Sequence, residues 1–533
     1  MIHTTMSMRG MVVAPHHLAA EAGLAVLREG GNAVEAMLAA AATIAVVYPH
    51  MNALGGDNFW LISGNGEPPL AIDACGPAAA RATIEHYRGA GHDAIPSRGP
   101  LAALTVAGAV GGWQLALEQA RALGGRLPLS RLLADAISHA RDGFPVSGTQ
   151  HRNTAGKLAE LAPQPGFAAT FLQDGAPPPV GVRFANRPLA ATLERLASAG
   201  LDDFYRGEVA RSLGKELEQA GSPVRLGDLE GFTARRVTPL GVRLRHGKTY
   251  NLPPPTQGLA SLMILGLVEQ LADAPAESFG YLHGLVECTK RAFQVRDRHV
   301  TDPAFTSFDA QAALDGENLK RIAAGIDPGR ALPWPQPAQP GDTVWLGAID
   351  RHGNAVSFIQ SIYWEFGSGV VLPSTGIVWQ NRGTSFSLDP GHPNALHPGR
   401  RPFHTIQPAM ALLDDGRVMP YGTMGGEGQP QTQSAIYTRY VVHGQALQEA
   451  ISRPRWLLGR TWGASVTSLR LESRFDPDVI DAMRRAGHDI ELTGPYDEAM
   501  GHAGALVLHR SGGLAGLIEG ASDPRSDGRA AAF

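Results

Sequence analysis

The pattern of apolar and polar positions divides the 533-residue chain into two compositional parts. Up to about residue 330, apolar residues recur at helical spacing in long stretches that Gly- and Pro-containing loops separate. These helical patterns cover residues 17–29, 32–48, 188–199 and 259–300. The second contains the longest uncharged apolar run of the chain. It predicts a buried, alanine-rich helix that is capped by Asn32 and stopped by Pro49.

From Thr343 onward, short runs of β-branched and aromatic residues dominate, and such runs favour strands. The expected strands cover residues 344–349, 355–363 and 409–413. Between the first two lies a compact polar segment, residues 350–354, of the kind that closes a hairpin. Two helical patterns follow, at residues 431–443 and 477–486. Strands and helices in both parts predict sheets covered by helices, a layered α+β arrangement.

Composition and charge restrict the classes of partner. With 44% hydrophobic and 18% charged residues, the chain has the composition of an ordinary globular protein. A formal net charge of -4 and the lack of a Lys/Arg run argue against a nucleic-acid or anionic-membrane surface. The longest apolar run is shorter than the roughly 20 residues of a membrane span, and the N-terminal segment lacks the apolar region of a signal peptide. We therefore expect a cytoplasmic protein with a small-molecule substrate.

Candidate metal ligands and cysteines are few. Cys75 and Cys288 are the only cysteines, too few for a disulfide framework or a structural zinc site, and they are expected to be free buried thiols. The spacing His283-x-x-x-Glu287, together with Asp302, offers no third ligand at a telling distance in sequence. The sequence predicts neither a metal nor a cofactor.

Thr343 is the first candidate for chemistry, because it follows a proline-rich stretch at residues 331–340. Cleavage between Asp342 and Thr343, by an N-to-O acyl shift, would expose an N-terminal threonine. Such a residue carries its own base, since an α-amine has a reference pKa of about 7.7 to 8.0. The alternative remains open that Asp-Thr simply begins a strand and that the prolines form an interdomain linker.

The second candidate is the glycine-rich segment at residues 422–429, where four glycines can bring backbone N–H groups close to an anion. The anion could be a phosphate or the oxyanion of a tetrahedral intermediate, and a tight turn that requires positive φ is the structural alternative. A nucleotide-binding P-loop would need Gly-Lys-Ser/Thr, whereas Gly428 is followed by Gln429 and Pro430.

Taken in order, the segments of this chain resemble the γ-glutamyltransferase family of N-terminal-nucleophile hydrolases over nearly its whole length. The matching segments are residues 22–33, 54–59, 253–258, 281–283, 302–303, 342–343, 350–356, 366–369, 401–402 and 425–426. The resemblance implies a four-layer αββα sandwich. It also implies a large subunit, residues 1–342, and a small subunit, residues 343–533, cut from one precursor, with a homo-oligomer of that unit left open.

The same resemblance implies the catalytic residues. Thr343 is at the position of the family's nucleophile, and Ser361 matches a hydroxyl residue that hydrogen-bonds to it. Gly425 and Gly426 match the glycine pair that supplies the N–H groups of the oxyanion hole.

Substrate recognition departs from the family pattern. A carboxylate-binding arginine, four residues before a proline, is replaced here by Asp73. The positions of the family's serine pair and of its α-amine contacts hold other residue types: His404 and Thr405, and Tyr363, Arg382 and Ser385. This exchange of charges predicts weak binding of a γ-glutamyl zwitterion.

The sequence therefore predicts hydrolysis of a different small amide, with Arg382 binding an anionic group near the carbonyl. The pattern is similar to the amidohydrolase branch of the family, whose members include enzymes acting on oxamate, and more distantly to its β-lactam acylases. Two other interpretations stay open for individual residues: Arg382 in a surface ion pair and His404 as a structural residue. Two others stay open for the whole chain: a true γ-glutamyltranspeptidase or glutathione hydrolase, and an unprocessed, non-catalytic ligand-binding homologue.

Overall fold

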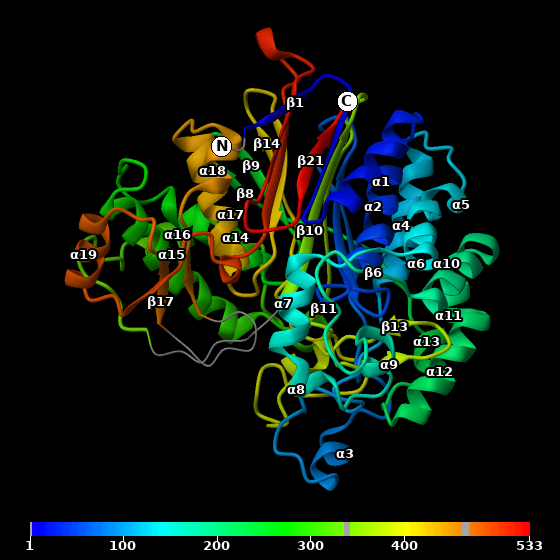
Figure 1. Ribbon diagram of the computed structural model, residues 1–533. Helices are drawn as coiled ribbons and strands as arrows, with labels where there is room; N and C mark the ends of the chain where they lie inside the picture. Colours follow the sequence, from blue (N-terminus) through cyan, green and yellow to red (C-terminus); the bar gives the residue numbers. More distant parts are fainter. Residues whose placement is uncertain (1–2, 335–341, 460–467) are drawn as a thin grey trace.

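Two seven-stranded antiparallel sheets lie face to face at the centre of the molecule (Figure 1), a computed structural model that describes residues 3–334, 342–459 and 468–533. The first, the β10 sheet, has the order β21 (Arg529–Ala532), β2 (Gly10–Ala14), β10 (Asp342–Asp350), β11 (Ala355–Tyr363), β3 (Asp57–Ser63), β4 (Leu70–Ala74) and β7 (Arg235–Val237). The second, the β15 sheet, has the order β1 (Thr5–Ser7), β20 (Ile518–Ser522), β19 (Ala503–Leu508), β15 (Val418–Thr423), β14 (Ala409–Leu413), β9 (Gly247–Asn251) and β8 (Leu240–Leu244).

Helices cover the outer face of each sheet, so the molecule has four layers, αββα (Figure 1). The helices that cover the β10 sheet, or that pack on the helices covering it, are α1 (His17–Arg28), α2 (Ala33–Val47), α4 (Ala109–Ala122), α6 (Ala134–Asp142), α10 (Arg187–Ala199) and α12 (Glu208–Ala220). On the β15 sheet and behind it are α14 (Gly258–Val268), α15 (Phe279–His299), α17 (Gly428–Tyr437) and α18 (Leu447–Ser452). The predicted fold class and four-layer architecture are confirmed.

Shorter elements fill the periphery. The helices among them are α3 (Ile84–Gly89), α5 (Leu129–Leu132), α7 (Gly148–Gly156), α8 (Leu158–Leu161), α9 (Phe167–Phe171), α11 (Asp203–Arg206), α13 (Leu226–Glu230), α16 (Gly316–Ala323) and α19 (Pro477–Arg485). The strands are β5 (Phe144–Pro145), β6 (Arg183–Phe184), β12 (Val371–Leu372), β13 (Ile377–Val378), β16 (Trp456–Leu458), β17 (Leu469–Glu472) and β18 (Ile490–Thr493).

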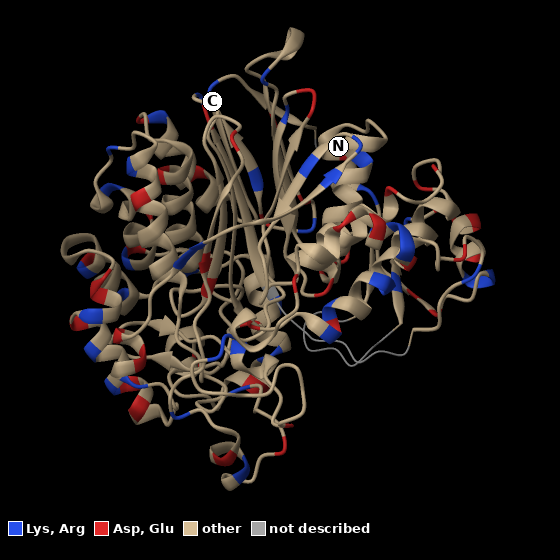
Figure 2. Ribbon diagram, turned by 180° about the vertical axis from the view of Figure 1, so that it is seen from behind, with Lys and Arg blue, Asp and Glu red and all other residues tan. Residues whose placement is uncertain are grey.

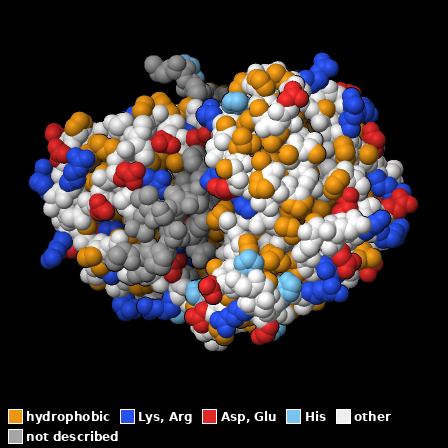
Figure 3. Space-filling model, turned by 60° about the horizontal axis from the view of Figure 1, so that its bottom comes forward, with side chains coloured by type: hydrophobic (Ala, Val, Ile, Leu, Met, Phe, Trp, Pro, Cys, Tyr) orange, Lys and Arg blue, Asp and Glu red, His pale blue; other side chains and the backbone are white. Residues whose placement is uncertain are grey.

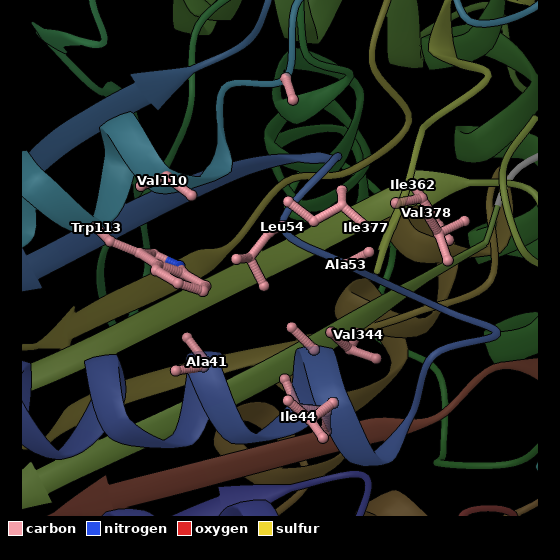
Figure 4. Packing of buried hydrophobic residues seen from close by; sticks show 14 of the residues in the cluster. Ala41, Ile44, Ala53, Leu54, Val110, Trp113, Val344, Ile362, Ile377 and Val378 are labelled. Atoms are coloured by element: carbon pink, nitrogen blue, oxygen red, sulfur yellow. The ribbon is translucent and has the colours of Figure 1, made fainter. Parts of the chain in front are cut away.

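Three hydrophobic clusters occupy the three spaces between the four layers. Between the β10 sheet and its helices, Ala41 and Ile44 of α2 lie beside Val344 of β10 (Figure 4). Because side chains alternate along a strand, the next residue, Trp345, points the other way and belongs to the cluster between the sheets. A Cβ at Gly422 of β15 would lie 2.2 Å from the Trp345 indole, so the close approach of the sheets requires glycine there.

Both sheets combine strands from before and after the Asp342–Thr343 bond. In the β10 sheet, β10 and β11 lie between β2 and β3, and in the β15 sheet β14 pairs with β9. The two predicted subunits therefore share both sheets and the helices on the β15 sheet, whereas the helices on the β10 sheet all precede residue 342, and the subunits do not form two separate cores. Cleavage of this bond would leave both products joined by two sheets.

Several predicted elements are confirmed with their boundaries. Helix α2 begins after Asn32, whose side chain accepts hydrogen bonds from Val34 and Glu35 in a capping box. The polar segment 350–354 closes the hairpin between β10 and β11.

The helix predicted at 259–300 was wrong as one continuous element, because the chain leaves the helix at residues 269–278, where Pro275 interrupts it. The pattern at 431–443 starts earlier, at Gly428, and ends in a π-helical turn, Thr438–Val442.

Charged side chains lie on the outer helices and loops, and the central strands carry few of them (Figure 2). Acidic and basic side chains are mixed over the face in Figure 3, with no extended region of one sign. No helix in the described ranges has both the length and the apolar character to cross a bilayer. The compartment and the oligomeric state stay predictions.

Candidate active site

Thr343 lies near the start of β10, where the pairing register with β11 shifts between Asp342 and Val344. The residue is fully buried. Its Oγ1 accepts a hydrogen bond of 3.3 Å from Nε2 of Gln429, a residue in the first turn of α17. The prolines at 335, 337 and 340 and the side chain of Asp342 lie outside the described part of the chain.

Gln429 is held by a buried amide network behind it. Its Oε1 accepts the backbone N–H of Gln407 at 3.3 Å. The Gln407 side chain in turn bonds to Asn251 and to Ser261, and Gln433 donates to the Gln407 carbonyl at 2.9 Å. Because each side-chain amide of this network has a partner, the network fixes the orientation of the Gln429 amide toward Thr343.

The glycine turn connects β15 to α17 and has the positive φ angles that favour glycine, +117° at Gly425 and +52° at Gly426. Within the described residues, neither the Gly425 nor the Gly426 N–H donates to a protein acceptor. Their carbonyls accept from Gly428 at 2.8 Å and from Gln429 at 3.3 Å. Two backbone donors are thus available beside the helix that contacts Thr343.

The segment 253–258 holds this turn from behind. Gln257 donates to the Gly426 carbonyl at 2.8 Å and to the Thr405 carbonyl at 2.6 Å. Arg296 of α15 donates to Gln257 Oε1 at 3.1 Å and forms a buried ion pair of 2.6 Å with Glu427. A buried pair of this kind fixes geometry more than it adds stability.

Arg382 is fully buried, so the interpretation as a surface ion pair was wrong. Its guanidinium lies 3.8 Å from the centre of the Tyr363 ring and donates to Thr405 Oγ1 at 3.2 Å and to Ser361 Oγ at 3.4 Å. Its Nε has no described partner. Burial lowers the pKa of Arg382 to about 10, which leaves the group cationic at neutral pH.

Tyr363 and Ser361 end strand β11 next to Thr343. Tyr363 has a φ of +82°, a conformation that non-glycine residues seldom adopt, and its N–H donates to Ser361 Oγ at 2.8 Å. Such strain is common at functional sites. The turn places the tyrosine ring under Arg382.

His404 forms a buried pair with Asp57, a residue of β3 that lies opposite Ser361 in the sheet. The distance from His404 Nε2 to Asp57 Oδ2 is 3.0 Å, and Asp57 Oδ1 accepts N–H groups from Gly76 at 3.0 Å and Gly108 at 2.9 Å. Burial raises the pKa of Asp57 to about 7 and, with Arg382 nearby, lowers that of His404 well below its usual value.

Asp73, at the position of the missing arginine, pairs with Arg401 and, at 3.1 Å, with Arg235. Arg401 also binds Asp302 at 2.7 Å. These groups neutralise one another, so Asp73 leaves no free charge for a substrate. Asp302 is likewise paired with Arg401.

Two buried clusters have side chains close enough to share a metal ion: Asp57, Cys75 and His404, and His283, Glu287 and His488. Their existing contacts fit hydrogen-bonded clusters. Burial raises the pKa of the Cys75 thiol well above its usual value, and Lys290 donates to Glu287 Oε1 at 2.6 Å in the second cluster. Cys75 and Cys288 are both buried free thiols.

The structure thus brings together the residues that the sequence singled out: Thr343, Ser361, Tyr363, Arg382, His404, Thr405, Gly425 and Gly426. Sequence reasoning missed four others that hold them: Asp57, Gln257, Arg296 and Gln429. Asp57 and Gln257 lie inside matched segments, and Gln429 follows the glycines directly. For these three residues that position was the available signal, and no sequence signal pointed to Arg296.

Comparisons with known proteins agree with this arrangement. The family model described as gamma-glutamyltranspeptidase matches residues 19–533. The chain is 57% identical to the oxamate amidohydrolase proenzyme of Klebsiella pneumoniae subsp. pneumoniae over 99% of both chains. It is 41% identical to the glutathione hydrolase-like YwrD proenzyme of Bacillus subtilis over 98% of both. Among solved structures, the cephalosporin acylase from Bacillus halodurans superposes with a TM-score of 0.91 at 32% identity, covering 100% of this chain and 97% of the acylase.

Proposed function

This chain belongs to the gamma-glutamyltranspeptidase family and is an N-terminal-nucleophile hydrolase, and we propose that it is a self-processing amidohydrolase with Thr343 as its nucleophile. The observation that carries this proposal is the 3.3 Å contact of Gln429 with Thr343 Oγ1. It joins the start of β10 to the glycine turn, which supports one site for the proposed nucleophile and the proposed oxyanion donors.

Processing comes first in the proposed sequence. In the continuous chain the Thr343 nitrogen belongs to a peptide bond and cannot act as a base. Attack of Oγ1 on the Asp342 carbonyl breaks the Asp342–Thr343 amide bond, which frees the α-amine and leaves an ester on Oγ1. Water then hydrolyses that ester to the Asp342 carboxylate and the free Thr343 hydroxyl. The products are a large subunit of residues 1–342 and a small subunit of 343–533, held together by the shared sheets.

In the processed enzyme, the free α-amine takes the Thr343 hydroxyl proton as Oγ1 attacks the substrate carbonyl. In this proposal the N–H groups of Gly425 and Gly426 stabilise the oxyanion, which is the largest contribution in many acyl transfers. The leaving amine of the substrate takes up a proton and departs, and water then hydrolyses the acyl ester on Thr343. Ser361, which accepts from Arg382 and from the Tyr363 N–H, links the nucleophile region to the cation.

Arg382 carries the proposal for substrate class. A buried guanidinium with an unpartnered Nε suits a carboxylate close to the scissile amide. Oxamate, in which a carboxylate is bonded directly to the amide carbonyl, has this form, and it is the substrate in the name of the relative at 57% identity. His404, Thr405 and Tyr363 complete the proposed binding surface.

The test is a direct comparison of two substrates. We expect ammonia release from oxamate and little glutamate release from glutathione. The reverse result would make the protein a glutathione hydrolase. An uncut chain that turns over neither substrate would identify a non-catalytic homologue.

A further inference from the structure

Nδ1 of His404 and Nε of Arg382 are buried atoms of the site that lack a partner among the described residues. Both residues are fully buried, and Arg382 donates to Thr405, the neighbour of His404 in sequence. A buried polar atom without a hydrogen bond costs on the order of 1–3 kcal/mol, so such atoms indicate a place where a ligand completes the bonding.

The state of His404 Nδ1 depends on how many protons the pair with Asp57 holds. Asp57 Oδ1 is occupied by the N–H groups of Gly76 and Gly108, so only Oδ2 faces His404 Nε2. With two protons on the pair, one lies between Oδ2 and Nε2 and the other is on Nδ1. With one proton, that proton lies between Oδ2 and Nε2, and Nδ1 is a bare acceptor.

We propose that Asp57 is a positioning residue that keeps a proton on His404 Nδ1, so that the site offers the substrate's anionic group an N–H donor beside the Arg382 guanidinium. Loss of one proton from the pair turns this donor into an acceptor, which repels a carboxylate. The identity of the anion as the substrate's own carboxylate rests on the proposed function.

The groups around the pair support the protonated form. Burial raises the pKa of Asp57 to about 7 in spite of the neighbouring Arg382. A bound carboxylate would neutralise that guanidinium and so raise the pKa further. Cys75 remains a neutral thiol, Tyr205 of α11 remains a neutral phenol, and the charge of Arg401 is balanced by Asp73 and Asp302. The switch therefore falls near neutral pH.

The substitution Asp57→Asn isolates the donor state. The Gly76 and Gly108 N–H groups would retain the amide oxygen, so the amide nitrogen would donate to His404 Nε2 and fix the proton on Nδ1. If Asp57→Asn does not fold, His404→Asn tests whether a donor is needed at this position, because the amide nitrogen of the new asparagine donates at every pH. Cys75→Ser is the matched control, since it changes a neighbour of Asp57 and leaves the pair intact.

The experiment is the KM for oxamate between pH 5.5 and 9.5. We expect the KM of the wild type and of Cys75→Ser to rise about tenfold per pH unit above the pKa of the pair, as loss of one proton requires. Asp57→Asn and His404→Asn should lose this rise. A rise that persists in Asp57→Asn, or one that Cys75→Ser abolishes, would overturn the proposal.

A second measurement does not depend on turnover. A protonated buried carboxylic acid has an infrared carbonyl band, which should be present in the wild type at pH 6, decrease as the pH passes 7, and be missing from Asp57→Asn. No such band in the wild type would overturn the proposal even with active enzyme. If the band titrates but the protein does not hydrolyse oxamate, the result supports the protonated Asp57–His404 pair and shows that the proposed substrate is wrong.

Discussion

Gln429 Nε2 lies 3.3 Å from Thr343 Oγ1, across 86 residues of sequence. The contact joins the first turn of α17 to the start of β10. Because the glycine turn immediately precedes α17, it also sets where the Gly425 and Gly426 N–H groups lie relative to the hydroxyl.

Replacement of Gln429 by Leu should reduce kcat by about 10- to 100-fold, because the hydroxyl loses the donor that orients it. The amide network at Gln407 would lose one partner, so thermal unfolding must be measured beside kcat. Gln448→Leu is a suitable control, since Gln448 is also buried and hydrogen-bonded but lies in α18. Normal kcat in a folded Gln429→Leu variant would exclude the orienting role.

Replacement of Arg382 by Ala should raise the KM for oxamate by about 10- to 100-fold, the loss of a charge-assisted hydrogen bond of roughly 1.5–3 kcal/mol. Arg382→Lys should recover only part of this, because an ammonium lacks the planar fork that stacks on Tyr363. Steady-state kinetics on fully processed protein provide the measurement. If Arg382→Ala leaves both KM and kcat unchanged, Arg382 does not bind the substrate.

Arg296→Met should destabilise the protein by about 3–5 kcal/mol, because it removes the buried guanidinium that pairs with Glu427 and donates to Gln257. Urea unfolding gives the free energy. The matched control is Arg243→Met, which removes an exposed partner of Asp414 and should cost no more than about 1 kcal/mol. Equal losses from the two variants would mean that Arg296 does not brace the glycine turn.

Asp57→Asn should stabilise the protein more at pH 8.5 than at pH 5. Burial raises the Asp57 pKa to about 7 in the folded state, above the reference of about 3.9 for the unfolded chain. The folded state therefore binds the proton more tightly, and the contribution of Asp57 to stability is lost as the pH rises through 7. Asparagine has no such proton. The Tm difference between variant and wild type should grow with pH, and a constant or shrinking difference would refute the raised pKa.

The local elements could be predicted from the sequence because their causes are local. Asn32 caps α2 through contacts two and three residues away, and the hairpin after β10 is closed by a five-residue segment with four polar residues and Gly353. The break between α14 and α15 was missed because apolar periodicity continues through residues 269–278, although Pro275 cannot continue the helix.

The site was only partly predictable, because its supporting contacts connect distant residues. Asp57 and His404 are 347 residues apart, and no spacing in the sequence connects them. Asp73 is neutralised in part by Arg401, which is 328 residues away in sequence, so this ion pair could not be predicted from spacing. Family resemblance singled out Thr343 and the glycine pair as candidates. It also gave the position of Arg382, but it did not predict which residues an arginine at that position would contact.

The central claim is that Thr343 is the processing nucleophile, and the intact mass of purified protein tests it most directly. The wild type should give two fragments, of 342 and 191 residues out of 533, and Thr343→Ala should give one uncut chain. A single full-length species in both proteins, or cleavage of Thr343→Ala at the same bond, would contradict the account.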